Sequence, residues 1–279
     1  MKKEKTITVR RQKIQPDRTK KRLCFFLFLT ALLLLTVVFA EQICPYDPNA
    51  QDTGAALLPP GAGHLAGTDR FGRDMLSRIL VGLKTSVTST LILVVVVTVT
   101  GSILGLICGY FGGIADTVIM RISDICLAFP GLVFAMAIAA LLNGGISNAV
   151  LALALISWPK YARIARSQTL TVKEMPYIAA AKLSGCNGMQ ILLRHIFPNI
   201  AGTMIVTAML DIGTMIMELA GLSFLGLGAT PPMAEWGSMM SNGRSMLQTC
   251  PWIVIAPGIA MFVTVAIFNL LGDTVRDMI

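Results

Sequence analysis

The chain has 279 residues, of which 54% are hydrophobic and only 14% are charged, and its mean hydropathy is +0.71. Soluble domains carry about 25% charged residues, so this composition excludes an ordinary soluble protein and predicts an all-α integral membrane protein. The formal charge of +8 lies in residues 1–22, which hold ten basic and two acidic residues, and the rest of the chain is neutral. The positive charge therefore predicts a tail, since a nucleic-acid-binding domain would carry a basic face.

Six segments predict transmembrane helices, because a bilayer core of roughly 30 Å needs about 20 apolar helical residues. The segments are Leu23–Ala40, Val87–Phe111, Ile125–Leu142, Ile146–Trp158, Ile200–Leu227 and Ile253–Leu271. The third contains Pro130. The fourth is short and ends at Pro159, so we expect Lys160 to extend its aliphatic stem to the membrane interface.

The first apolar segment has a second interpretation, because Val38-Phe39-Ala40 is similar to the cleavage site of a signal peptide. Its apolar run of 18 residues exceeds the usual 7 to 15 or so of such a peptide, which favours a retained membrane anchor. With the N-terminus in the cytoplasm, 18 Lys and Arg residues fall inside and five outside. This bias predicts that both ends of the chain are cytoplasmic.

The predicted organisation follows from these spans. Residues 1–22 form a basic cytoplasmic tail, 23–40 the first transmembrane helix, and 41–85 an extracellular segment. Residues 86–279 form a core of five spans, with a cytoplasmic segment at 160–198. Glycines recur at intervals of four through the end of the second span, at Gly101, Gly105, Gly109 and Gly113. They predict a helix face without side chains, on which another helix packs closely.

The cytoplasmic segment predicts two helices joined by a turn. Tyr177–Leu183 favours helix, Gly185 interrupts it, and Met189–Phe197 resumes apolar spacing before Pro198. Taken alone, this pattern also fits an ordinary amphipathic hairpin on the inner surface.

The same segment resembles the Glu-Ala-Ala loop of the importer permeases of the ATP-binding-cassette (ABC) class, in Ala179–Ala181, Gly185 and Phe197–Pro198. Two positions depart from that pattern, since Ala179 stands in place of Glu and His195 in place of an aliphatic residue. Three further segments are similar to the dipeptide, oligopeptide and nickel branch of these permeases. They are HLAGTDRFGRDMLSR at 64–78, DICLAFP at 124–130 and LSFLGLGATPPMAEWG at 222–237.

This resemblance covers residues 45–279 and implies an ABC importer permease fold with a cytoplasmic coupling helix. It implies four kinds of partner: a homologous second permease subunit, two cytoplasmic ATPase subunits, an extracellular solute-binding protein and membrane lipid. The matching residues Ala180, Ala181, Gly185 and Pro198 become candidates for coupling to the ATPase. The chain lacks the G-x-x-x-x-G-K-[ST] phosphate loop, so we expect no enzymatic activity and no cofactor here, with ATP and Mg bound by the partner subunits.

The outer segment carries four charged residues, Asp69, Arg73, Asp74 and Arg78, ahead of apolar residues at helical spacing. Thr68 or Asp69 is a possible cap, and Asp74 precedes Arg78 by four positions. These features predict an amphipathic helix outside the membrane. It either contacts the binding protein or the partner permease, or simply covers the bundle.

The fifth span contains Asp211, Met215 and Glu218 on nearly one helix face. Ionised carboxylates are costly in hydrocarbon, so this face is predicted to avoid lipid. It lines the translocation pathway or meets another subunit, and the plainer alternative is that Asp211 pairs with a polar group on another helix.

No metal site is predicted in the chain. His64 and His195 fall on opposite sides of the membrane, and neither has Cys or Asp at ligand spacing. Four methionines of the last outer loop, Met233, Met239, Met240 and Met246, are explained better by packing than by soft-metal binding.

Within the resembled branch, Asp211-Ile212-Gly213 and Ala220–Phe224 favour a permease for nickel or a nickel chelate. Import of dipeptides or oligopeptides is the alternative. A stand-alone channel or secondary transporter is the alternative of a different class, and such proteins surround a site at mid-membrane with charges or broken helices.

Overall fold

The computed structural model describes residues 16–278, and helices form its regular structure apart from one isolated bridge between Thr68 and Asp74. The all-α prediction is confirmed. The first fifteen residues of the predicted basic tail lie outside the described part. The longer helices are α1 (Pro16–Val38), α3 (Met75–Phe111), α4 (Gly113–Ala128), α5 (Gly131–Leu141), α6 (Ile146–Lys173), α7 (Pro176–Leu183), α9 (Phe197–Phe224), α10 (Trp236–Gly243) and α11 (Trp252–Arg276). The short ones are α2 (Ala40–Ile43), α8 (Gly188–Ile191), a π segment at Leu192–Ile196 and 3-10 turns at Thr53–Ala55 and Arg244–Met246.

Four helical rods among the described residues are long and apolar enough to cross a membrane: α1, α3, α11 and the rod from Gly188 to Phe224. The pair α4 and α5 adds a fifth if it is one broken span. The predicted count of six is reached only when α6 is included. Helix α6 is long enough to cross a membrane, but the charged residues in its second half make it less apolar than the four rods.

The predicted third span, Ile125–Leu142, is not one straight helix. Helix α4 begins at Gly113 and ends at Ala128, and α5 leaves at an angle of 96°. The break lies at Pro130, because a proline disfavours helical geometry in the residue before it. Phe129 is accordingly extended, with φ −103° and ψ 150°.

Two other prolines were predicted to end helices, and neither does. Pro159 lies inside α6, which continues to Lys173. Residues 160–173 of the predicted cytoplasmic segment are therefore helical. Pro198 is the second residue of α9 and follows the π segment, in which the Phe197 N–H bonds to the Leu192 carbonyl. A π segment widens the backbone where proline lacks its own N–H, so the rod continues from Gly188 into the membrane.

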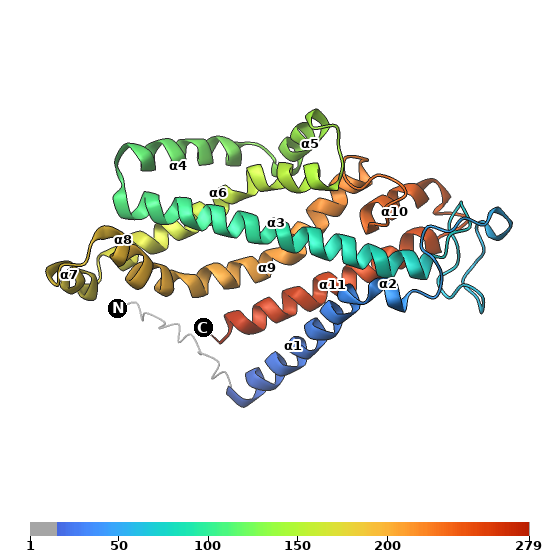
Figure 1. Cartoon of the computed structure of the whole chain (residues 1–279), viewed down its shortest axis with the longest axis horizontal. Coiled ribbons are helices and arrows are strands. Elements are labelled where there is room, and N and C mark those ends of the chain that lie inside the picture. The colour runs from blue at the N-terminus through green and yellow to red at the C-terminus, as the bar shows by residue number, and fades with distance from the viewer. Residues whose placement is uncertain (1–15, 279) are drawn as a thin grey trace, which may run out of the picture.

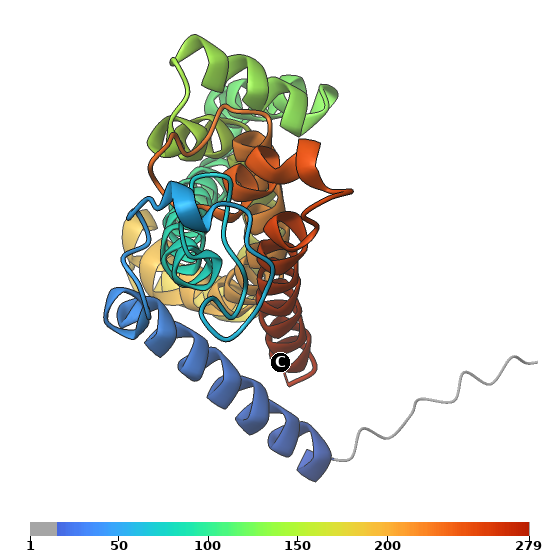
Figure 2. The same cartoon turned by 90° about the vertical axis from the view of Figure 1, so that its right-hand side faces the viewer.

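Helices α3 and α6 pack closely along their length. A side-chain carbon added at Gly101, Gly105 or Gly109 would lie within 3.0 Å of atoms of α6, so these glycines form the predicted contact face. Gly113 does not belong to it, since it has a φ of +68° and starts α4. Helix α1 packs on α11 and α3 at the side of the bundle, as Figure 2 shows.

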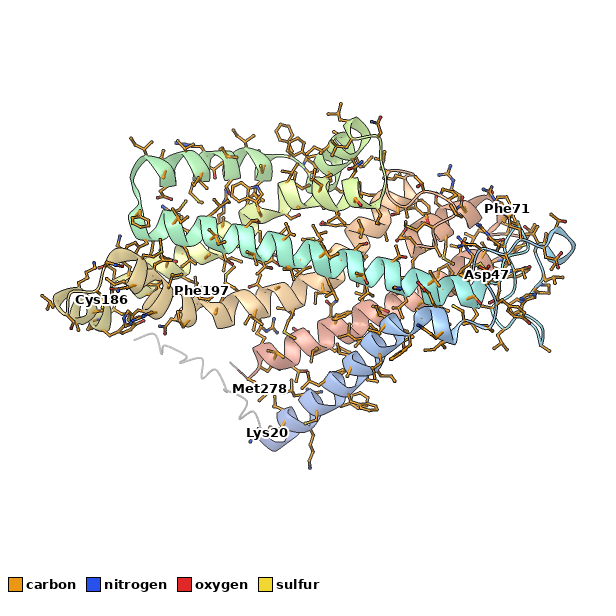
Figure 3. The ribbon with its side chains drawn as sticks, viewed as in Figure 1. Lys20, Asp47, Phe71, Cys186, Phe197 and Met278 are labelled. Carbon is orange, nitrogen blue, oxygen red and sulfur yellow. The ribbon has the colours of Figure 1, made fainter. Side chains whose placement is uncertain are left out.

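The molecule is elongated, with α7 and α8 at one end of its long axis and the loops that follow α2 at the other (Figure 1). Figure 3 labels Cys186 at the first end and Asp47 and Phe71 at the opposite one. This separation is the arrangement that an inner hairpin and an outer segment require.

Candidate functional site

The hairpin at the inner end joins α7 to α8 through a glycine turn. The N–H of Gly185 bonds to the Lys182 carbonyl and that of Cys186 to the Ala181 carbonyl, which is the Schellman arrangement that closes a helix. Gly185 has a φ of +82°, as the arrangement requires. Asn187 then caps α8 in a reciprocal capping box with Gln190, whose side chain accepts from the Asn187 N–H.

The candidate coupling residues occupy different places in this hairpin. Ala180 and Gly185 are exposed, Ala181 is largely buried, and Pro198 is exposed at the start of α9, beyond the hairpin. Leu183, the last residue of α7, was not predicted as a functional residue, and it is 91% exposed.

Tyr177 and Met189 of the same hairpin are also exposed apolar residues. We call Tyr177, Leu183 and Met189 the hairpin patch. Its signal in the sequence is the apolar character of residues on a short helix that the rest of the chain does not cover.

A second group of functional side chains lies where α6 crosses α9. The Lys160 ammonium nitrogen is 2.5 Å from Oδ1 of Asp211, and the Tyr161 hydroxyl donates to Oδ2 at 3.0 Å. Lys160 and Asp211 each lie at the middle of a 28-residue helix. The Lys160 ammonium, predicted to extend to the membrane interface, contacts a buried carboxylate on the neighbouring helix.

The three residues singled out on the fifth span differ in their surroundings. Asp211 and Met215 are buried, and the bonds of Asp211 to α6 favour the plainer interpretation of an interface between helices. Glu218 is partly exposed, and no hydrogen bond or ion pair links its carboxylate to the residues that the structure describes.

The outer charged segment is not a separate amphipathic helix. Its apolar residues begin α3, which runs without a break into the second span and is about 55 Å long at 37 residues. The cap is Asp74, whose Oδ2 accepts from the N–H of Ser77, and not Thr68 or Asp69. His64 Nδ1 contacts the other oxygen of Asp74 at 2.9 Å.

The predicted side-chain pair of Asp74 with Arg78 does not form. The Arg78 guanidinium donates to the Pro48 carbonyl instead, and its Nε lies 3.8 Å from Oδ2 of Asp69. Asp69 bonds instead to Arg73, with Nη2 and Oδ2 2.7 Å apart. All four charged residues are buried, so they tie the outer loops onto α3.

A family match covers residues 101–279, and the family is described as "Binding-protein-dependent transport system inner membrane component". The chain is 44% identical to the probable D,D-dipeptide transport system permease protein DdpC of Escherichia coli K12, over 90% of this chain and 84% of that protein. It is 43% identical to the glutathione transport system permease protein GsiD of Pectobacterium atrosepticum, over 89% and 83%. It is 38% identical to the dipeptide transport system permease protein DppC of Haemophilus influenzae, over 90% and 87%.

The fold is similar to that of a solved structure of the MetNI methionine ABC transporter in an inward-facing conformation. The TM-score is 0.57 at 16% identity, over 74% of this chain and 98% of that chain.

Proposed function

This chain belongs to the family of binding-protein-dependent transport system inner membrane components, and from that premise we propose that it carries short peptides. It is a multi-pass inner membrane protein and the permease subunit of an ABC importer, and the ATPase activity belongs to partner subunits. Family membership replaces the alternative of a stand-alone channel or secondary transporter.

The observation that carries the proposal is the description of the relatives. The three relatives named above are 38 to 44% identical to this chain over about nine-tenths of its length. Their names assign them to transport systems for a D,D-dipeptide, for glutathione and for a dipeptide. All three cargoes are short peptides. Peptide import, the alternative in the sequence analysis, is therefore preferred to nickel import, which these relatives do not support.

The assembly we propose has a homologous second permease, two ATPase subunits that hold ATP and Mg, and an external binding protein. The hairpin patch and the exposed residues Ala180 and Gly185 are the surface we assign to the ATPase. Two observations support this assignment. These residues are exposed, and the hairpin, in which Figure 3 labels Cys186, lies at the end of the molecule opposite the outer loops.

Transport measurements on a deletion strain test the cargo. Removing this chain should abolish ATP-dependent uptake of a radiolabelled dipeptide, and a plasmid copy should restore it, while nickel uptake stays unchanged. If the deletion lowers nickel uptake and leaves dipeptide uptake intact, the peptide assignment is wrong.

A further inference from the structure

The crossing of α6 and α9 leaves two opposite charges available to a ligand. An ammonium group has three N–H donors, and among residues 16–278 that of Lys160 bonds to Asp211 alone. About half of the Lys160 side chain, 51%, is exposed. Glu218 is partly exposed on the neighbouring helix, and its carboxylate has no bonded partner in the described part of the chain.

The Glu218 carboxylate is unfavourable against lipid, because it lies in the apolar rod from Gly188 to Phe224 and a charged side chain within a membrane span is costly. Glu218 must therefore face either water or polar groups of another molecule. Thr214, which is exposed and lies between Asp211 and Glu218 along α9, adds a hydroxyl group in the same region.

The rise between two positions on α9 is close to the length of a short peptide. Asp211, which holds the Lys160 ammonium, and Glu218 are separated by seven residues, a rise of about 10 Å along the helix. An extended chain spans at most about 3.3 to 3.6 Å per residue, so two or three residues cover about 7 to 11 Å. A free peptide carries an ammonium group at one end and a carboxylate at the other.

We propose that Lys160 and Glu218 form a two-ended recognition site for zwitterionic short peptides in the translocation pathway. Lys160 faces the terminal carboxylate of the peptide, and Glu218 faces its terminal ammonium group. Asp211 and Tyr161 are positioning residues, since they hold the Lys160 side chain at the crossing. The inference rests on the proposed function and adds the chemistry by which the membrane part recognises its cargo.

The first test measures uptake of a radiolabelled dipeptide by the complete importer in membrane vesicles. Glu218→Gln keeps the size of the side chain and removes its charge, so uptake should fall at least about tenfold, the loss expected for one charge-assisted hydrogen bond. Glu218→Asp, which keeps the charge, should retain most of the uptake. Glu41→Gln is the matched control, because Glu41 is an exposed outer carboxylate that pairs with the half-exposed Lys84.

The second test asks whether the site faces water. In a chain without its native cysteines, Thr214→Cys should react with a small hydrophilic thiol reagent in the assembled complex, and saturating dipeptide should slow the reaction. Phe28→Cys on α1 is the control, because Phe28 is an exposed apolar residue of a membrane-spanning helix and should stay unreactive.

Three results would overturn the inference. Normal uptake by Glu218→Gln would remove the carboxylate from recognition. Loss of the partner subunits from purified Glu218→Gln complexes would make the residue a subunit contact, and an unreactive Thr214→Cys would exclude a water-filled site. Failure of the wild-type complex to transport any dipeptide would instead refute the proposed function, so the two failures are distinguishable.

Discussion

Gly185 occupies a backbone conformation that few other residues adopt, at a position that none of the described residues crowds. Its φ is +82°, and no atom lies within 4 Å of the place where a side-chain carbon would stand. A substitution there changes the surface of the hairpin. Its only cost in folding free energy is that of the left-handed conformation, about 1 to 2 kcal/mol for an L-residue and less for Asn or Asp. A substitution at Gly185 can therefore test docking with little effect on folding.

Gly185→Asp should abolish dipeptide uptake while the protein remains in the membrane at normal levels, because a charge at the turn opposes docking into the ATPase. Gly185→Asn is the matched control, since the two side chains have the same size and both tolerate positive φ. Uptake and immunoblot levels measure the effect. Wild-type uptake by the Asp variant would exclude Gly185 from the coupling surface.

Leu183→Ser should reduce co-purification of the ATPase subunits severalfold, because Leu183 is the most exposed residue of the hairpin patch. Leu65→Ser is the control, since Leu65 is also a strongly exposed leucine but lies in the outer segment. Affinity purification followed by quantitative blotting of the ATPase gives the ratio. Equal recovery with both variants would show that the patch contributes no binding energy to that contact.

At the scale of helices, packing decides where each element continues and where it turns. The face of α3 that carries Gly101, Gly105 and Gly109 brings its backbone against α6. Helix α6 continues through Pro159, whereas the chain bends sharply at Phe129-Pro130, between α4 and α5. Proline disfavours helix at both sites, so the proline alone does not decide which one breaks.

Gly105→Ala should destabilise the protein by about 1 to 3 kcal/mol, the usual cost of overpacking. The added carbon would stand within 3.0 Å of the Ala165 side chain and the Arg166 nitrogen, and one of these helices would have to move. The measurement is thermal unfolding in detergent, followed by size-exclusion chromatography. Gly63→Ala is the control because nothing lies within 4 Å of that position, and an equal loss in both variants would contradict the packing account.

At the scale of the whole molecule, the long axis separates two chemically different ends. One end has the apolar hairpin patch, and the other has outer loops held by the buried contacts of Asp69 with Arg73 and of Asp74 with His64. A protein that takes cargo from an external binding protein and energy from an internal ATPase needs these two ends on opposite sides of the membrane.

Cysteine labelling with a membrane-impermeant reagent checks this orientation. In a background without native cysteines, Asp52→Cys should label in intact cells and Lys182→Cys only after lysis, because both residues are exposed at opposite ends. Labelling of Lys182→Cys from outside would place the hairpin on the wrong side and refute the topology.

The sequence by itself determined the membrane class, most of the spans, the helix–turn–helix hairpin and the family, because apolar run length, Lys and Arg bias and short motifs are local properties of the chain. It also singled out Asp211 and Glu218 as charged residues of the fifth span and predicted that their face avoids lipid. It could not predict that Lys160 meets Asp211, since that contact joins residues 51 positions apart across two helices. Only the tertiary structure decided that Asp211 has a partner while Glu218 has none among the described residues, because satisfaction of a buried charge depends on which helices pack together and not on the spacing within one of them.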